Sequence, residues 1–430
     1  MASFEGQMSA KVEATSEHFS LQEYDQAIGL LKTARSFEVN DPEALIYLNN
    51  AELENNKQKY YTIAVVAPLN ASSSNTQKNS GIEIIRGIAQ AQELVNHPEK
   101  YQGYRLTQAD GKQLGNKINS LGLKVVIADD GNQAAIAKQI AEDLSKNTEI
   151  QGVIGHFSSG VTKAVAPLYE ENQLVLISPT STAVKIFPSR QYTFRTVPTN
   201  DEFARKLADY LSRQGHQKVA VIYNNESEYS SDLKSGFRSE FSGEATEDLQ
   251  FSDNSLPDNL EKILEAKATA IVLLPDGKTR PKALDVVRNQ TNSDIKIVGG
   301  DSFYNDQLSE IQNLKEGLVL AVPWYRGCHL DSEFLKVSKK LWGTGAVSWR
   351  TAFAYDATLV LIEALKQKPA TRQELRQILV SDNPQFQVKY GATGEISFKD
   401  SGDRFGGRIQ LVEVVNNQGS LKFQPKPSCN

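Results

Sequence analysis

Apolar residues recur with helical spacing in the first part of the chain. Between Tyr24 and Ala51 they return every three or four positions, and Asn40-Asp41-Pro42 interrupts the series with a capping residue and a proline suited to begin a helix. This pattern predicts a helical hairpin, which the polar stretch ENNKQK at 54–59 links to the rest of the chain.

A second pattern begins at Tyr60, where short apolar runs alternate with amphipathic stretches. The runs are rich in Val and Ile without a clean polar alternation, which is typical of strands covered on both faces. They lie at 61–69, 124–129, 152–156, 174–179, 218–223, 270–274, 295–301 and 317–323. Helices are expected at 81–95, 132–146, 161–171, 201–214, 231–241, 258–266, 279–289, 331–342 and 351–367. Eight such strands exceed one compact core, so the sequence predicts an α/β protein with two lobes built on parallel sheets.

Composition and charge exclude several classes of protein. The chain has 430 residues and a net charge of −5 without a basic stripe, so nucleic acid is not an expected partner. No stretch approaches the roughly 18 apolar residues that span a bilayer, and Met1 to Ala10 lacks the pattern of a secretory signal. Cys328 and Cys429 are too few for a zinc site, and their spacing does not decide whether they pair.

Two clusters of small polar residues follow predicted strands. GHFSSG spans Gly155 to Gly160 and SPTST spans Ser178 to Thr182. Free N–H groups at a helix start, together with hydroxyls, form a seat for a carboxylate or phosphate that needs no basic residue. A single serine in such a place more often caps a helix or forms a turn, but two clusters at neighbouring strand ends favour a binding site.

Catalytic motifs are absent from the sequence. A serine hydrolase elbow reads G-x-S-x-G, but His156 stands where Ser158 would need a glycine, and Phe157 where Ser159 would. A histidine after an apolar strand is more often hydrogen-bonded and half-buried than a general base. No phosphate-binding loop, dinucleotide motif or metal-ligand spacing occurs. The sequence therefore predicts a protein that is not an enzyme and binds neither metal nor cofactor.

The segment GVIGHFSSGVTKAVAPLYEENQLVLISPTSTAV resembles the central part of type I periplasmic binding proteins, close to the leucine/isoleucine/valine-binding receptors of ABC transporters. The resemblance continues in the same order through FRTVPTNDEFARKLADYL, KIVGGDSFYN and GATGEISFKDSGDR, and it covers about 60–421. It implies two α/β lobes joined by three hinge crossovers, with lobe 1 at 58–194 and 325–390 and lobe 2 at 195–324 and 391–430.

The residues before the two lobes, 1–57, resemble one tetratricopeptide repeat. A repeat array needs about three units to bury its own core, so a single helical pair must lean on another element. We expect it to act as a spacer or to dock a partner.

The resemblance assigns ligand-binding roles to the two polar clusters of lobe 1. Ser159 matches the serine that holds the carboxylate of an amino acid, and Thr182 matches the threonine that serves both charged groups. Thr180 lies where a backbone carbonyl accepts from the ammonium group. Ser158 and Ser181 belong to the same clusters and complete the expected site on this lobe.

Two further site residues are implied in lobe 2. Tyr229 matches the aromatic residue that closes over the ligand, and Asp301 matches the acidic residue that pairs with the ammonium. Asp301 is one methylene shorter than the glutamate of some family members, which affects distance and ligand size. The alternative role of Asp301 is to cap a helix ahead of SFYNDQL.

The function implied by the resemblance is that of a monomeric receptor for free L-α-amino acids. It would deliver an apolar or small polar ligand to the membrane permease of an ABC transporter or to a sensor protein. The polar region 69–81 suits a broad specificity. Such receptors work in the periplasm or outside the cell, so we expect an export or anchor segment that the present chain lacks. The alternative is an envelope protein of the same fold that binds no ligand and regulates a cell-wall synthase.

Overall fold

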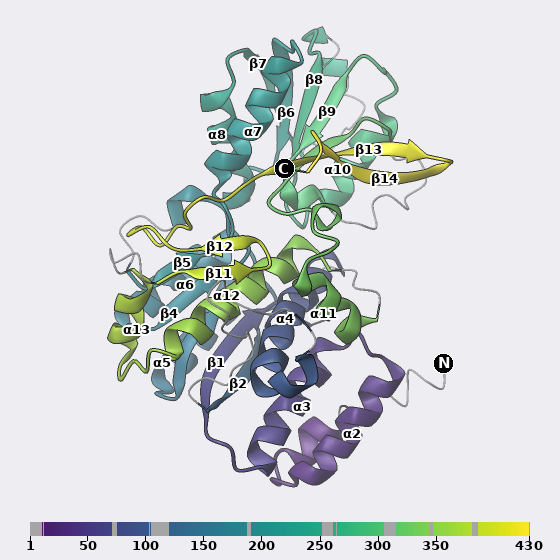
Figure 1. The fold of residues 1–430 in the computed structure, drawn as a ribbon. Helices are drawn as coiled ribbons and strands as arrows, with labels where there is room; N and C mark the ends of the chain where they lie inside the picture. The colour runs from purple at the N-terminus through teal and green to yellow at the C-terminus, as the bar shows by residue number, and fades with distance from the viewer. Residues whose placement is uncertain are drawn as a thin grey trace.

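The structure is a computed structural model that describes the chain except for several loops and ends (Figure 1). The described residues are 11, 13–70, 75–102, 104, 120–186, 191–251, 261–263, 265–304, 315–343, 347–380 and 386–429. Two lobes lie one above the other in Figure 1, and each is built on its own central sheet.

The sheet of the first lobe has five parallel strands in the order β2-β1-β3-β4-β5. The strands are β1 (Tyr60–Ala67), β2 (Gly122–Asp129), β3 (Ile150–Ile154), β4 (Val175–Ser178) and β5 (Thr193–Arg195). Helices α4 (Asn75–Asn96) and α12 (Trp349–Leu365) pack with Ile63 and Val65 of β1. Helices α5 (Ala134–Lys146) and α6 (Ser159–Glu171) pack with Ala64 and Val66 on the other face. Burial on both faces explains why β1 is apolar throughout.

The sheet of the second lobe has seven strands in the order β14-β13-β10-β9-β8-β6-β7. Five of them are parallel, and β13 and β14 form an antiparallel edge. The strands are β6 (Lys218–Tyr223), β7 (Glu244–Gln250), β8 (Ala270–Leu274), β9 (Lys296–Gly299), β10 (Val319–Val322), β13 (Gln410–Asn417) and β14 (Ser420–Lys426). Helices α7 (Asn200–Arg213) and α8 (Glu228–Glu240) pack on one face, and α10 (Arg280–Asn289) packs on the other.

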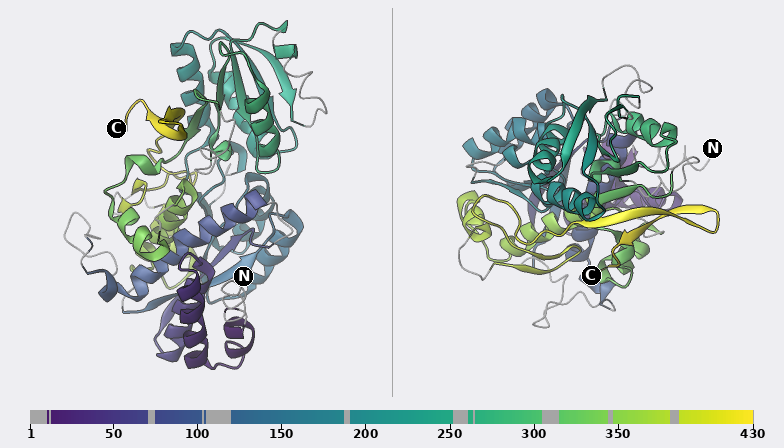
Figure 2. Two further views of the ribbon diagram at one scale, coloured as in Figure 1. Left: turned by 90° about the vertical axis from the view of Figure 1, so that its right-hand side faces the viewer. Right: turned by 90° about the horizontal axis from the view of Figure 1, so that it is seen from above.

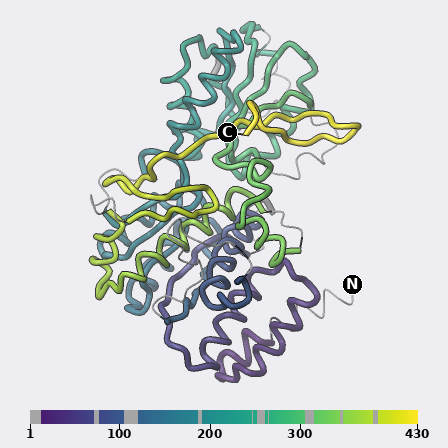
Figure 3. The backbone as a smooth tube through the Cα atoms, viewed as in Figure 1, coloured from purple at the N-terminus to yellow at the C-terminus, as the bar shows by residue number. Residues whose placement is uncertain are grey.

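The chain passes between the lobes at three places, as the tube in Figure 3 shows. The first passage follows β5, the second follows β10, and the third lies between β12 (Gly394–Ile396) and β13. Strand β12 pairs with β11 (Val388–Gly391), and Asp356 of α12 accepts a 2.6 Å hydrogen bond from the Ala392 amide between these strands. Cys328 and Cys429 form a disulfide, which ties the second passage to the C-terminal end of the chain. The exact bounds expected for the lobes remain a prediction.

The N-terminal helical hairpin consists of α2 (Tyr24–Phe37) and α3 (Pro42–Asn55), and Asp41 caps α3 by accepting a 3.0 Å bond from the Ala44 amide. It lies at the end of the first lobe away from the second lobe, as the left view of Figure 2 also shows. The likeness to a tetratricopeptide repeat remains a prediction.

The hairpin covers the edge strand β2. Asn50 of α3 accepts a 3.1 Å bond from the Val125 amide and donates a 2.8 Å bond to the Val125 carbonyl. Asn96 of α4 pairs in the same way with the backbone of Leu123. An exposed edge would leave these backbone groups open to pairing with another chain. The single helical pair therefore packs against the first lobe.

The eight expected strands all occur, with ends that agree within about two residues. Strands β5, β7 and β11 to β14 were not expected, nor was α13 (Arg372–Leu379), while α11 (Glu333–Trp342) and most of the other expected helices occur. The helix expected at 258–266 falls partly outside the described residues. The remaining helical elements are short: Ala14–His18, Pro98–Tyr101, Val184–Ile186, Asp301–Phe303 and Arg326–Cys328.

Candidate functional site: a cavity between the lobes

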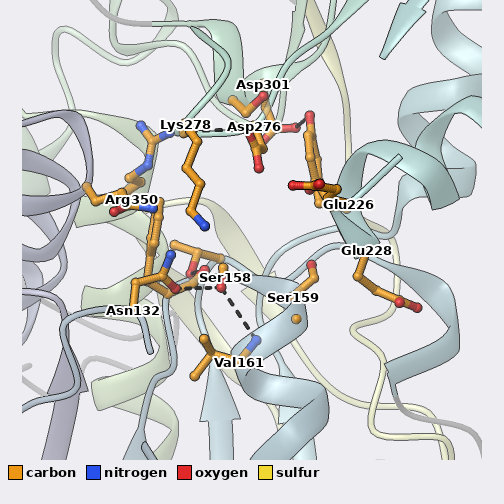
Figure 4. A pocket seen from close by; sticks show the side chains of 18 of the residues that line it. Asn132, Ser158, Ser159, Val161, Glu226, Glu228, Asp276, Lys278, Asp301 and Arg350 are labelled. Carbon is orange, nitrogen blue, oxygen red and sulfur yellow. Dashed lines mark hydrogen bonds between the residues drawn. The ribbon is translucent and has the colours of Figure 1, made fainter. Parts of the chain in front are cut away.

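The carboxyl ends of strands from both sheets face a shared cavity of about 250 Å³ (Figure 4). This is slightly below the roughly 300–1,000 Å³ typical of pockets for drug-sized ligands, so it suits a small molecule. The first lobe contributes Gln77, Asn132, Ala134, the residues from Phe157 to Val161, Thr180, Trp349 and Arg350. The second lobe contributes the residues from Glu226 to Tyr229, those from Asp276 to Lys278, Asp301 and Ser302.

The start of α6 forms the floor of the cavity on the first lobe. Ser158 caps this helix, because its Oγ accepts from the Val161 amide at 3.5 Å, and the same hydroxyl donates to Asn132 Oδ1 at 2.5 Å. Ser159 follows it and lines the cavity. A Cβ placed on Gly160 would meet nothing within 4 Å, so the backbone is open to a ligand here. The first turn of α6 carries no acidic residue, and its positive dipole end favours an anion.

The loop before α6 is held from behind by His156. Its Nδ1 lies 2.7 Å from Asp130 Oδ2 and its Nε2 lies 3.1 Å from the Tyr169 hydroxyl, and both His156 and Asp130 are fully buried. The sequence pattern favoured a hydrogen-bonded histidine over a general base, and the structure places His156 outside the cavity lining. Its role here is to fix the position of the serines that follow it.

The polar cluster at 178–182 mainly holds the cluster at 155–160 in place through hydrogen bonds. The Thr180 hydroxyl donates to the Phe157 carbonyl at 2.7 Å, and Ser181 Oγ lies 2.7 Å from Thr162 Oγ1. Thr180 reaches the cavity, whereas Ser181 and Thr182 are fully buried and do not line it. Among the described residues Thr182 Oγ1 has no hydrogen-bond partner. Five of the seven predicted site residues therefore meet in one cavity.

The second lobe supplies an acidic group opposite α6. The Tyr229 hydroxyl donates a 2.8 Å hydrogen bond to Asp301 Oδ1, and Asp301 is only 3% exposed. A Cβ on Gly300 would lie 2.6 Å from the Tyr229 hydroxyl, so a glycine is required for this contact. The helical turn after β9 begins at Asp301 with Gly300 as its N-cap, and Asp301 faces the cavity.

Burial raises the pKa of Asp301 to about 6, although the Tyr229 hydrogen bond and the positive charge of Arg350 each oppose the shift. Burial, and then the neighbouring Asp301, raise the pKa of the Tyr229 phenol. A carboxylate that is costly to ionise in an empty cavity gains most from a cationic partner, because an opposite charge favours its ionised form.

Sequence reasoning missed several lining residues. Asn132 and the Asp276–Lys278 turn follow β2 and β8, so the rule that ligands bind beyond strand ends could have found them. Trp349 and Arg350 also line the cavity, but they begin α12 and do not follow a strand of the sheet that this helix covers. The rule about strand ends therefore does not locate them.

The two lobes touch beside the cavity. Lys163 of α6 and Glu228 of α8 form an ion pair with an N–O distance of 2.9 Å. On the opposite side, a Cβ on Gly277 would lie 3.3 Å from Gln77 Cγ of α4. Of the residues in these contacts, Gln77, Gly277 and Glu228 line the cavity.

The fold and the cavity define a two-lobed binding protein, and the chain belongs to the periplasmic binding protein family, whose sequence model matches residues 61–419. The Leu/Ile/Val-binding protein homolog 1 of Brucella abortus (strain 2308) is 23% identical over 295 residues, which are 66% of this chain and 77% of that protein.

Solved structures show the same fold. An ABC transporter substrate-binding protein from Desulfitobacterium hafniense in complex with Leu has a TM-score of 0.66 at 22% identity, covering 85% of this chain and 100% of that one. A solute binding protein from Rhodopseudomonas palustris BisB5 in complex with 3,4-dihydroxy benzoic acid has a TM-score of 0.70 at 18% identity, covering 85% and 96%. Within the described part of the chain, no helix combines the length and apolar character needed to cross a membrane.

Proposed function

We propose that the protein is an extracytoplasmic receptor for free L-α-amino acids, which it binds between its lobes. Closure at the three passages would present the loaded form to the permease of an ABC transporter or to a sensor protein, with the receptor acting as a monomer. Relatives named as Leu/Ile/Val-binding proteins and a fold neighbour bound to Leu support this class of ligand.

One observation carries the proposal: the two walls of the cavity differ in charge as a zwitterion requires. The wall around Ser159 offers a hydroxyl and the free N–H groups of α6, and the facing wall offers the carboxylate of Asp301. In the proposed complex the α-carboxylate binds at the start of α6 and the ammonium binds Asp301.

We further propose that the protein acts by binding rather than by catalysis. Ser158 and Ser159, the nucleophile candidates in the cavity, have no histidine among the residues that line it. The interaction-protein alternative calls for a cleft blocked by side chains, whereas this cavity retains about 250 Å³ of free space.

Isothermal titration calorimetry with the common L-amino acids tests the proposal. We expect saturable binding of at least one of them at a stoichiometry of one per chain, and no binding of the corresponding amine that lacks the α-carboxylate. The absence of heat with every L-amino acid, or binding of 3,4-dihydroxybenzoate alone, would contradict it.

A further inference from the structure

The cavity wall beside Asp301 carries a guanidinium whose N–H groups donate to none of the residues that the structure describes. Arg350 lines the cavity with a side chain that is 9% exposed. Within the described residues its guanidinium makes no hydrogen bond, and its Nε is buried without a partner. Its one ion pair joins Nη1 to Glu83 Oε2 at 3.9 Å, the long limit of such contacts. Arginine has five N–H donors and no acceptor, so this side chain can be satisfied only by acceptor atoms.

An unsatisfied buried donor is costly, and more so when it is charged. Glu83 does not meet the need, because the same carboxylate oxygen also accepts from the Ser348 hydroxyl. Trp349, which lines the cavity next to Arg350, likewise has a buried Nε1 without a partner in the described structure. Its ring lies 4.4 Å from the guanidinium carbon of Arg350 and holds that group by a cation–π contact.

The side chains around Arg350 carry more positive than negative charge, so this part of the cavity favours an additional anion. Arg280 lies close enough that its pKa is lowered to about 10, first by burial and then by the charge of Arg350. Lys278 lines the cavity and reaches toward its centre in Figure 4, without an ion pair among the residues described. Arg350 forms its ion pair with Glu83 and its charge acts on Asp301, and the proposed ammonium of the ligand occupies Asp301. Once a zwitterion is bound, the positive charges of Arg350, Arg280 and Lys278 therefore outnumber the carboxylates left to pair with them.

The other acidic residues of the cavity lie away from Arg350. Glu226 and Glu228 stand on the opposite side in Figure 4, and Glu228 is paired with Lys163. Asp276 is occupied by its own turn, because its side chain accepts from the Thr279 hydroxyl at 2.8 Å and from the Thr279 amide at 2.9 Å. Apart from Asp301, the cavity is thus cationic on the side of Arg350 and anionic on the side of Glu226 and Glu228.

We propose that the side chain of the bound amino acid ends in a second carboxylate, which Arg350 receives. The ligand class is therefore the acidic L-α-amino acids, aspartate and glutamate, rather than the apolar or small polar ligands that the family resemblance implies. This inference rests on the proposed function, since it places the α-amino and α-carboxylate groups at Asp301 and α6. A planar guanidinium binds a carboxylate through two parallel hydrogen bonds, which a neutral amide cannot reproduce.

Calorimetric titration of the whole chain with L-glutamate and L-glutamine tests the inference, because the two ligands match in shape and differ in charge. We expect glutamate or aspartate to bind at least about thirtyfold more tightly than glutamine, which corresponds to the lower end of the cost of an unpaired buried charge. Arg350→Gln should remove this preference, so that the ratio of the glutamate and glutamine affinities falls to about one. Arg288→Gln makes the same change of charge on the outer part of α10, where Arg288 pairs with Asp285, and should keep the preference.

The outcomes separate the two proposals. Equal affinity for glutamate and glutamine, or a tighter fit for leucine, overturns the acidic-ligand inference and leaves an amino-acid receptor. An equal loss for all ligands in Arg350→Gln overturns it as well. Binding of no amino acid at all refutes the proposed function itself. If Arg350→Gln does not fold, as judged by its thermal transition, the ligand preference of the unmodified protein and the variant Arg350→Lys decide the question.

Discussion

The pH dependence of ligand affinity provides a sharp test of the role of Asp301. In the ligand-free protein the pKa of this carboxyl is about 6, raised mainly by burial, against about 3.9 in an unfolded chain. The folded state therefore holds the proton more tightly than the unfolded state between these values. On this account the contribution of Asp301 to the free energy of unfolding falls by roughly 3 kcal/mol as the pH rises from about 4 to about 6.

A ligand ammonium reverses the preference, because it stabilises the ionised carboxylate. With a pKa of about 6, about one molecule in ten has Asp301 ionised at pH 5, so amino-acid affinity should be about tenfold weaker at pH 5 than at pH 8. Asp301→Asn removes the charge and should weaken binding by about 2–5 kcal/mol, or about thirtyfold to several thousandfold. It should also abolish the pH dependence over this range.

Titration calorimetry at pH 5, 6, 7 and 8 measures both effects. Asp356→Asn is the matched control, because burial likewise raises the pKa of Asp356 to about 6 although its carboxylate is bonded to Thr393 and lies outside the cavity lining. That variant should alter stability and keep the pH dependence of affinity. A flat affinity profile in the unmodified protein, or an unchanged profile in Asp301→Asn, would refute the assignment.

Three further changes test the framework of the site. Gly300→Ala should push the Tyr229 hydroxyl away from Asp301. Ligand binding should then weaken by roughly tenfold or more, which corresponds to the loss of one hydrogen bond to a charged group. Unchanged affinity in calorimetry would contradict this. His156→Ala removes the hydrogen-bond partner of the buried Asp130 Oδ2 and should lower the free energy of unfolding by about 1–3 kcal/mol in urea titration, whereas a loss below about 0.5 kcal/mol would show that this hydrogen bond is not structural. Cys328→Ser opens a disulfide across 101 residues and should cost about 2–5 kcal/mol, and a thiol reductant should lower the stability of the unmodified protein but not of the variant.

Burial on both faces made most strands predictable, and its absence explains those that were missed. Strand β5 has three residues, too few to show a pattern, and β7 has the polar sequence EATEDLQ at the edge of its sheet. The β13–β14 hairpin did carry a sequence signal, which is the glycine at position 419. Gln418 and Gly419 both adopt positive φ in its turn, a conformation that glycine favours. The disulfide could not be inferred, since pairing depends on how the three passages bring distant segments together.

The site was partly predictable for a similar reason. The rule that parallel strands present their carboxyl ends to a ligand locates Ser159 and Asp301, since each follows a strand. It does not distinguish a hydroxyl that reaches the cavity from one that supports the loop, so Thr182 was expected to line a cavity that it does not reach. Arg350 begins a helix whose position depends on packing against α4, a contact across more than two hundred residues of sequence.

In the proposed complex, the α-carboxylate binds the first lobe and the ammonium binds Asp301 of the second lobe. This division determines how ligand binding would be coupled to closure of the lobes. A ligand shifts a conformational equilibrium only by the difference between its affinities for the two states. Among the described residues, the ion pair between the lobes beside the cavity joins Lys163 and Glu228, and because it is partly exposed it contributes about 0–1 kcal/mol. The Val184 amide of the first lobe also donates a 2.9 Å hydrogen bond to Asp232 of α8. A zwitterion that spans Ser159 and Asp301 contacts both walls only in the closed form, whereas an amine or a simple carboxylate contacts one wall in either form. Under the proposed function, closure would therefore report the simultaneous presence of both charged groups, and a partner that recognises the closed lobes would respond to amino acids without contacting the ligand itself.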